Sequence, residues 1–396
     1  MRSVTSDPVT LGKNPERSRE HNRRVVLDVV RRIGPVGRME IARQAHLTTQ
    51  AIANIVEELT TEGLLMPAGR LRIGRGQPPI QFAVNPDGAM TIGIEVGADH
   101  AKIVVVDLAG KARAKRFKPV ERTDPSDIAE LLNDEIADFR RTYSTRLLGA
   151  GVAKAGPFMT EESSAAGPTT LPEWVAYLSE ACGESIAVEN DATAAAMGER
   201  LFGAASSLSN FCMIYFGVGV GLGIFNEGWP IRGAAGNSGE IGRIPVRPRD
   251  GCGFGDLDSQ ASIYTLRQLL GDAGPGVVDF AWLEELYRTG NPLMASWLDR
   301  SASYLSPMVA MVENILDPET IILGGMLPDV MADDLIERLS PLPASVASQR
   351  LRSAPRVMRG QTGYYTAALG AAALPLYSAM TPRLETLSRH MMEDQI

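Results

Sequence analysis

Two short segments of apolar periodicity, joined by three residues, constrain the start of this chain more than any other feature. RMEIARQA (residues 38–45) is followed by HLT and then by TQAIANIVEELTTEG (residues 49–63). Apolar residues recur at helical spacing in both segments. The buried face of the second helix is predicted to consist of Ile52, Ile55, Val56 and Leu59. Two helices separated by such a turn form the core of a helix-turn-helix, so the segment predicts a DNA-binding motif.

The residues around the turn agree with this prediction. His46 stands where the motif usually has Gly, and His tolerates the left-handed backbone conformation better than most residues. Thr48 can cap the second helix, and Gly63 is a C-cap signal at its end. An additional helix is predicted before the motif, up to Gly34-Pro35. Its apolar stripe consists of Val25, Val26, Val29, Val30 and Ile33.

Beyond the helices, residues 64–86 alternate toward strand, break at GRGQPP and resume, which predicts a β-wing. Wing arginines would reach phosphates or a minor groove, and outward side chains at the start of the second helix would enter a major groove. The candidate DNA-binding residues are Arg38, Thr48, Thr49, Gln50, Asn54, Arg70, Arg72 and Arg75. The alternative is a small helical interaction module with a solvated basic face.

Charge separates this head from the rest of the chain. Residues 1–85 hold 13 Lys and Arg against 8 Asp and Glu, whereas all 396 residues carry a net charge of −8. A basic head on an acidic body indicates that only the head meets a polyanion. No run approaches about 18 apolar residues, and the N-terminal stretch lacks the apolar region of a secretory signal. We therefore expect a cytoplasmic protein without a membrane partner.

From Met90 onward the pattern is typical of an α/β protein with mixed sheets. Three strands with a DLAG hairpin turn are expected first, followed by a helix from about Asp124 to Tyr143. Further strands are predicted in LLGAGVA, SIAVEN, NFCMIYFGVGVGLGIFNEG and TIILGGM. The chain thus contains two sets of strands separated by helices.

Six segments of this body occur in the order and spacing of a known family: GIEVGAD, GVAKAGP, ENDATAAAMGE, FGVGVGLGIFNEG, GNSGEIG and ILGGM. The chain resembles the ROK family (repressor, open reading frame, kinase), which has the sugar kinase and actin-like ATPase fold. The head with GRGQPP is similar to the winged helix of that family's transcription regulators. The resemblance implies a winged helix-turn-helix followed by a two-lobed actin-like body.

The resemblance also implies a sugar site. In ROK kinases the catalytic base is the Asp that matches Asp191, and sugar hydroxyls are bound by residues that match Asn190, Asp191 and Glu240. The phosphate loops differ from the family pattern. Asp-x-Gly-Gly-Thr is replaced by residues 95–99, EVGAD, and Gly-Thr-Gly by residues 217–219, GVG. Because donors are lost and the Asp99 carboxylate repels a triphosphate, we expect no ATP binding and no catalytic residue.

The zinc site of the family is also expected to be lost. Arg243 stands at the position of its His, and Cys252 is alone where the family has a Cys cluster. One thiol without an imidazole cannot satisfy a four-coordinate site, so we expect no metal and no other cofactor.

Two cations next to the expected sugar site are unusual for the family. Lys154 replaces an aliphatic residue, and Arg243 replaces the His. If both face the cleft, they would recognise an anionic ligand such as a sugar acid or sugar phosphate. The alternative is that they neutralise Glu95 and Asp99 or point to solvent.

These observations predict a mobile N-terminus (1–15), a winged helix-turn-helix (16–88) and a ROK-type body (89–396). Its lobes are expected at about 89–189 with the C-terminal helix, and at about 190–379. The predicted function is a transcription regulator, a repressor by preference, that binds an inverted-repeat operator as a homodimer or tetramer and senses a sugar or acidic sugar. An active sugar kinase with a DNA-binding head, and a DNA-binding scaffold whose body only dimerises, are the alternatives.

Overall fold

The computed structural model describes residues 15–70, 79–158, 167–248, 255–271, 280–349 and 351–380. The chain forms two compact units, one from residues 1–88 with 376–396 and one from residues 89–375. Within the described ranges, every helix is too short or too polar to cross a bilayer.

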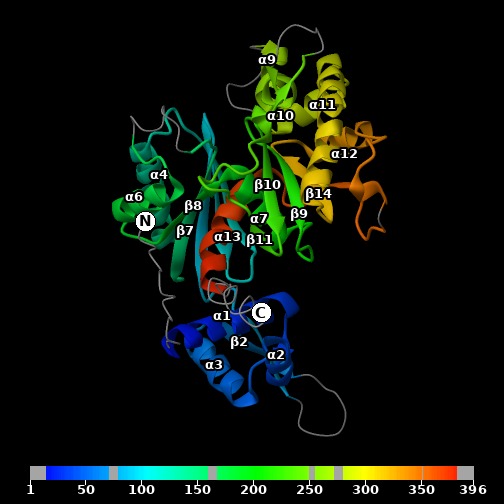
Figure 1. Cartoon of the computed structure of the whole chain (residues 1–396). Helices are drawn as coiled ribbons and strands as arrows, with labels where there is room; N and C mark the ends of the chain where they lie inside the picture. Colours follow the sequence, from blue (N-terminus) through cyan, green and yellow to red (C-terminus); the bar gives the residue numbers. More distant parts are fainter. Residues whose placement is uncertain are drawn as a thin grey trace, which may run out of the picture. The chain divides into compact units, whose positions relative to one another are not determined.

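In the smaller unit, residues 15–70 and 79–88 form three helices and a small antiparallel sheet in the order β1-β3-β2 (Figure 1). The helices are α1 (Pro15–Ile33), α2 (Arg38–Ala45) and α3 (Thr49–Thr61). The strands are β1 (Val36–Gly37), β2 (Leu65–Arg70) and β3 (Ile80–Val84). Strands β2 and β3 form the wing, so the predicted winged helix-turn-helix is confirmed.

The buried faces of these helices are close to those predicted. All four apolar residues named for α3 are at most 6% exposed, and Val26, Val29 and Val30 of α1 are at most 1% exposed. His46 has φ 52°, in the left-handed region, and the Thr48 side chain accepts a hydrogen bond from Ala51 N. The burial predicted for Ile33 is wrong: this residue is 46% exposed, because it ends α1 immediately before the turn at Gly34.

The larger unit contains two five-stranded sheets with the same arrangement: three antiparallel strands followed by two parallel ones. The first, in the order β6-β5-β4-β7-β8, consists of β4 (Met90–Val96), β5 (His100–Asp107), β6 (Ala112–Pro119), β7 (Leu147–Lys154) and β8 (Ile186–Asn190). The second, in the order β11-β10-β9-β14-β15, consists of β9 (Phe211–Phe216), β10 (Val220–Asn226), β11 (Trp229–Pro230), β14 (Thr320–Gly325) and β15 (Val357–Arg359). Strands β12 (Pro245–Val246) and β13 (Gly255–Asp256) form a separate pair.

Helices cover both sheets (Figure 1). The first sheet packs against α4 (Pro125–Thr142) and α6 (Leu171–Cys182). The second packs against α8 (Asp258–Ala261), α9 (Ile263–Leu270), α10 (Phe280–Arg288), α11 (Pro292–Leu316) and α12 (Asp329–Arg338). Short 3₁₀ helices are η1 (Ile241–Arg243), η3 (Val346–Gln349) and η4 (Gly363–Tyr365).

Helices α7 (Asp191–Phe202) and α13 (Thr366–Met380) pack between the sheets, where their alanines form a core with residues of β7, β9 and β14. Strand β9 is buried on both faces, which explains its continuous apolar sequence FCMIYF. Backbones approach closely here. A Cβ on Gly370 would lie 1.6 Å from Ala194 O, and one on Gly151 would lie 1.9 Å from Ala371 O, so only Gly fits at either position.

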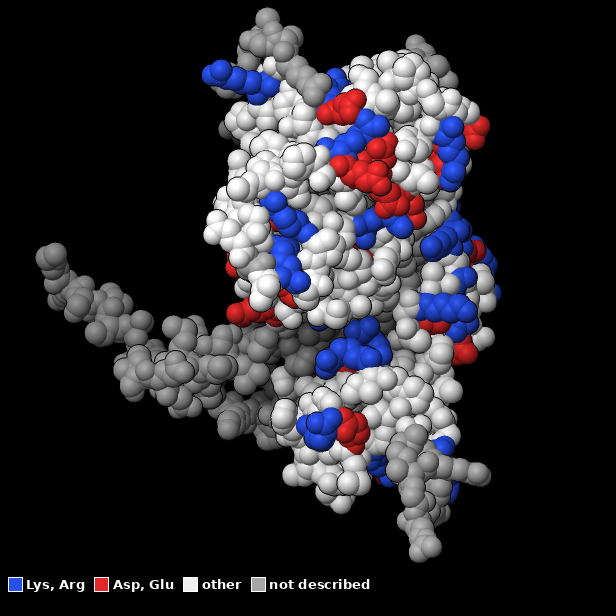
Figure 2. All heavy atoms as spheres, turned by 90° about the vertical axis from the view of Figure 1, so that its right-hand side faces the viewer, with Lys and Arg blue, Asp and Glu red and all other residues white. Residues whose placement is uncertain are grey.

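On the face shown in Figure 2, Lys and Arg side chains lie beside Asp and Glu side chains in several places. One ion pair of this kind, between Arg338 and Asp299, joins α12 to α11, and a second, between Arg338 and Asp334, lies within α12. The acidic excess of the body is therefore interrupted by cations on this face.

Candidate functional site

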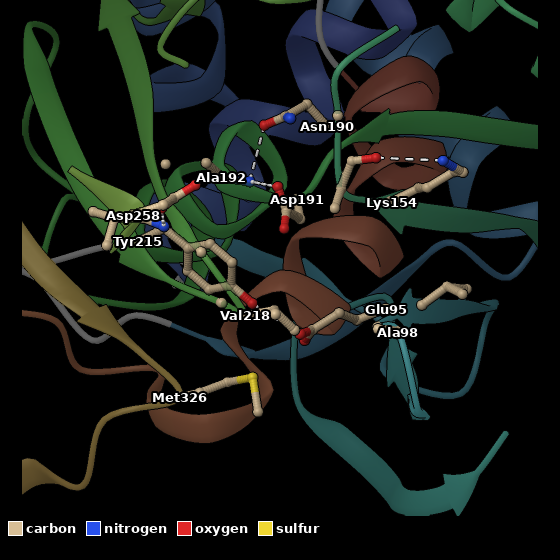
Figure 3. A pocket seen from close by; sticks show the side chains of 18 of the residues that line it. Glu95, Ala98, Lys154, Asn190, Asp191, Ala192, Tyr215, Val218, Asp258 and Met326 are labelled. Carbon is tan, nitrogen blue, oxygen red and sulfur yellow. Dashed lines mark hydrogen bonds between the residues drawn. The ribbon is translucent and has the colours of Figure 1, made fainter. Parts of the chain in front are cut away.

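A cavity of about 400 Å³ opens at the carboxyl ends of β4, β7, β8 and β9 in the larger unit (Figure 3). Ligands of open α/β sheets bind outside such strand ends. The polar and charged side chains that line it are Glu95, His100, Thr123, Lys154, Asn190, Asp191, Tyr215, Glu240, Arg243 and Asp258. The cavity thus brings together all five residues that the sequence predicts to bind a sugar.

Asn190 and Asp191 stand at the junction of β8 and α7. Asn190 is the N-cap: its Oδ1 accepts hydrogen bonds from Ala192 N (3.0 Å) and Thr193 N (3.1 Å). Asp191 Oδ1 accepts a bond of 2.8 Å from Ala192 N, as Figure 3 shows. Capping is therefore performed mainly by Asn190, and the second carboxylate oxygen of Asp191 faces the Gly217 loop.

The surroundings of Asp191 change its proton affinity. Burial raises the pKa of Asp191 to about 7, and the negative charges of Glu95 and Glu240 act in the same direction. The Ala192 N–H and the Lys154 ammonium oppose this shift. Near neutral pH the group can accept a hydrogen bond when ionised and donate one when protonated.

Glu240 lies just before η1, and its side chain, like that of Asn190, lies against Gly156. A Cβ on Gly156 would be 2.5 Å from Glu240 Oε1 and 3.4 Å from Asn190 Nδ2, so Gly156 leaves room for both side chains. Burial raises the pKa of Glu240, and Arg243, whose Nε lies 3.9 Å from Glu240 Oε2, lowers it. An amide donor and carboxylate acceptors in this arrangement suit a polyol.

Lys154 ends β7 and is half-buried. Its Nζ lies 5.2 Å from the centre of the Trp174 ring and 5.8 Å from that of Phe158, and it donates to Ala155 O. Burial lowers the pKa of Lys154, against the attraction of Asp191. Within the described part of the chain, no carboxylate lies within 4.0 Å of Lys154 Nζ.

The carboxylates that Lys154 and Arg243 were alternatively expected to neutralise have other partners. Glu95 Oε1 accepts bonds of 2.8 Å from Lys102 Nζ and from Tyr215 Oη. Asp99 pairs with Arg267 (3.1 Å) and with His100 Nδ1 (2.8 Å). Asp99 is thus paired with Arg267, a residue distant in sequence, and not with Lys154 or Arg243.

Sequence reasoning did not single out several residues of this cavity. Asp258 Oδ1 accepts a 2.7 Å bond from Val220 N, and its carboxylate lies against Gly219 and Gly242. Burial raises the pKa of Asp258. Neither Asp258 nor Tyr215 has a spacing signal, since one follows a loop and the other belongs to an apolar strand.

The structure describes only some of the residues at which the sequence predicts the loss of a zinc site. Among the described residues, no group of three or more His, Cys, Asp or Glu is arranged to hold a metal ion. Cys252 lies outside these residues, so the predicted loss of the zinc site stays a prediction.

The smaller unit carries the candidate DNA-binding residues. Thr48, Thr49, Gln50 and Asn54 are exposed at the start of α3, and Gln50 Nε2 donates to Asn54 Oδ1 (3.2 Å). Arg38 is exposed, with its guanidinium 5.0 Å from the centre of the Phe82 ring. Arg70 is exposed at the end of β2, whereas Arg72 and Arg75 lie outside the described residues.

Comparison with known proteins places these features in context. A sequence model of the ROK family matches residues 91–377. The DNA-binding transcriptional dual regulator NagC of Escherichia coli strain K12 is 24% identical over 360 residues, covering 86% of this chain and 88% of NagC. The crystal structure of a ROK family transcriptional regulator, a homolog of the E. coli MLC protein, has a TM-score of 0.70 at 22% identity and covers 92% of this chain and 98% of that one. The ROK hexokinase from Thermus thermophilus has a TM-score of 0.53 at 25% identity and covers 73% of this chain and 98% of its own.

Proposed function

Because the chain belongs to the ROK family, we propose that it is a DNA-binding transcription regulator whose larger unit binds a sugar or sugar derivative without phosphorylating it. The observation that carries the proposal is the cavity in which Asn190, Asp191 and Glu240 converge, in a chain that begins with a winged helix-turn-helix. Similarity to NagC along both units supports it.

On the DNA side, the exposed start of α3 would enter a major groove and the wing would contact the backbone or a minor groove. One short helix in one half-site gives limited specificity, so the active form would be a homodimer or tetramer on an inverted repeat. A sugar that binds one conformation of the body more tightly than another would change operator affinity, and repression relieved by the sugar is the preferred direction.

The test begins with selection of a binding sequence from random double-stranded DNA. Fluorescence anisotropy then follows the complex during titration with a panel of sugars. We expect at least one sugar to change operator affinity by about tenfold or more, a coupling of about 1.4 kcal/mol. Tight DNA binding that no sugar changes would favour the constitutive scaffold instead.

Asp191→Asn connects the cavity to this response. The variant should weaken the effect of the sugar while leaving DNA binding without sugar intact. The matched control is Asp329→Asn, a change of the same kind in the first turn of α12, outside the cavity. Loss of DNA binding in the Asp191 variant alone would assign Asp191 a structural role.

A finer proposal concerns the charge of the ligand. Lys154 and Arg243 both line the cavity, and neither is engaged by Glu95 or Asp99. We propose that they favour an acidic sugar. Isothermal titration with paired neutral and acidic sugars tests this, and a preference for the neutral member would reject it.

An active sugar kinase is the second candidate, because the raised pKa of Asp191 is near the value that suits a general base at neutral pH. A coupled ATP-turnover assay across the same sugars separates the two functions. Robust sugar-dependent turnover would replace our proposal with the kinase.

A further inference from the structure

Two buried hydrogen-bond acceptors line the cavity on the β4–β5 hairpin. Glu95 of β4 is 4% exposed and His100 of β5 is 1% exposed, and both line the cavity. The strand register pairs Glu95 with Lys102, and side chains two residues apart on a strand share a face. Glu95, Lys102 and His100 therefore lie on one face of the hairpin.

Glu95 uses only one of its two oxygens. Oε1 accepts from the Lys102 ammonium and the Tyr215 hydroxyl, each at 2.8 Å. Oε2 is buried and has no hydrogen-bond partner among the described residues. Lys102 and Glu95 form a buried ion pair, in which the positive charge of Lys102 balances the negative charge of Glu95.

His100 presents a second acceptor. Its Nδ1 lies 2.8 Å from Asp99 Oδ1, and since a carboxylate only accepts, Nδ1 carries the proton. Burial lowers the pKa of His100, so Nε2 keeps its lone pair at neutral pH. This nitrogen, too, is buried without a partner in the described part of the chain. The ring stacks on Phe117 with centres 5.5 Å apart and lies directly over Gly97.

We propose that Glu95 Oε2 and His100 Nε2 form a second subsite, which accepts hydrogen bonds from two neighbouring hydroxyl groups on a part of the ligand beyond the ring held by Asn190, Asp191 and Glu240. This inference rests on the proposed function, because it extends the same sugar site. The ligand would be a disaccharide, or a glycoside whose second part carries two neighbouring hydroxyls.

The chemistry of the subsite determines which chemical group of the ligand it can bind. Two acceptors require two donors, because a buried acceptor that lacks one costs stability in the complex. A phosphate brings further acceptors and a like charge, so it does not fit beside Glu95. An ammonium would add a cation next to Lys102, which already balances Glu95, so a neutral hydroxyl is preferred.

The experiment is isothermal titration of the full chain with sets of three sugars that share a first ring: the monosaccharide, its methyl glycoside and disaccharides joined 1→4 or 1→6. The methyl glycoside adds bulk without a donor. Glucose, xylose and N-acetylglucosamine provide the first rings, and their 2-aminoethyl glycosides provide the ammonium arm. We expect one disaccharide to bind at least tenfold more tightly than the matching methyl glycoside.

Variants test whether the subsite causes this preference, which is measured as the ratio of the affinity for the disaccharide to that for the methyl glycoside. His100→Phe keeps a ring that can stack on Phe117 but removes the acceptor, and should reduce the ratio to about one. His21→Phe, the same change in α1, is the matched control and should leave the ratio unchanged. Glu95→Gln removes the charge that Lys102 balances and can prevent folding. Gly97→Ala therefore serves as a second variant, because its Cβ would lie 2.5 Å from His100 Cε1 and displace the ring.

Each outcome has one meaning. A tenfold preference that His100→Phe and Gly97→Ala abolish supports the subsite. Disaccharides that bind no better than methyl glycosides, or a preference that survives both variants, overturn the subsite and leave the proposed function standing. Tighter binding of a 2-aminoethyl glycoside than of every neutral disaccharide overturns the choice of a hydroxyl. Absence of binding by all of these sugars and by the acidic sugars of the earlier titration overturns the proposed function and the subsite with it.

Discussion

The β4–β5 hairpin of the first sheet and the β9–β10 hairpin of the second both turn at the cavity, through loops that contain glycine. At the first, Glu95 is bonded to Lys102 and Tyr215, and Asp99 to Arg267 and His100. At the second, Gly217, exposed Val218 and Gly219 form the loop, and Asp258 from α8 accepts a hydrogen bond from the next residue, Val220, at the start of β10.

The comparison shows that one strand arrangement supports two kinds of loop. In the first hairpin, charges neutralise one another across elements far apart in sequence. In the second, small residues let another element approach the backbone. We therefore expect the first hairpin to depend on buried electrostatics and the second on single hydrogen bonds.

The largest effect is expected from Lys102→Met. This change leaves Glu95 buried without its cation, so the free energy of unfolding should fall by about 3–5 kcal/mol. Urea denaturation measures it. Lys115→Met, on the exposed edge of β6, is the control and should change stability by less than about 1 kcal/mol. A loss no larger than that of the control would show that the first hairpin does not depend on its ion pair.

The next effect concerns pH. The pKa of Asp191 is raised from 3.8 to about 7, so ionisation is disfavoured in the folded chain. This contribution makes the folded state lose stability as pH rises from about 4 to about 7, and the loss is complete above the folded pKa. Asp191→Asn cannot ionise.

The advantage of this variant over the natural chain should therefore grow by about 3–4 kcal/mol between pH 4 and pH 8. Unfolding in urea at a series of pH values gives both curves. Parallel curves would mean that Asp191 ionises freely and that the charges of the first hairpin do not reach it.

A smaller effect is expected at the second hairpin. Asp258→Ala removes the acceptor for Val220 N–H, whereas Asp258→Asn can retain one. The alanine variant should be less stable than the asparagine variant by about 1 kcal/mol. Thermal unfolding of the two proteins compares them directly. Equal melting temperatures would show that the hydrogen bond from Val220 N does not stabilise the second hairpin.

The smallest effect is expected from Val218→Thr, which adds a hydroxyl to the loop where the family has one. Since Val218 is 38% exposed, stability should change by less than about 0.5 kcal/mol. ATP turnover should not rise, because the first hairpin remains filled by its own charged groups. Turnover that appears on this single change would show that the second loop alone limits phosphoryl transfer.

Much of the fold could be predicted because its signals are local. The spacing of Ile52, Ile55, Val56 and Leu59 specifies the buried face of α3, and Thr48 caps the helix with a hydrogen bond three residues away. Asp124 likewise starts α4 at the predicted position. These features depend on interactions within a few residues, so a short window of sequence contains their causes.

The sequence by itself also indicated some of the residues that line the cavity: Asn190, Asp191, Glu240, Arg243 and Lys154. Only the tertiary structure decided their electrostatic setting. Tyr215 bonds to Glu95 across 120 positions, and Arg267 reaches Asp99 across 168. The first pair joins the ends of strands from different sheets and the second joins the β4–β5 turn to α9, and no local periodicity encodes such a distant partner. For that reason the sequence did not identify the partner of Asp99, and the unpaired acceptors of Glu95 and His100 emerged only from the packed hairpin.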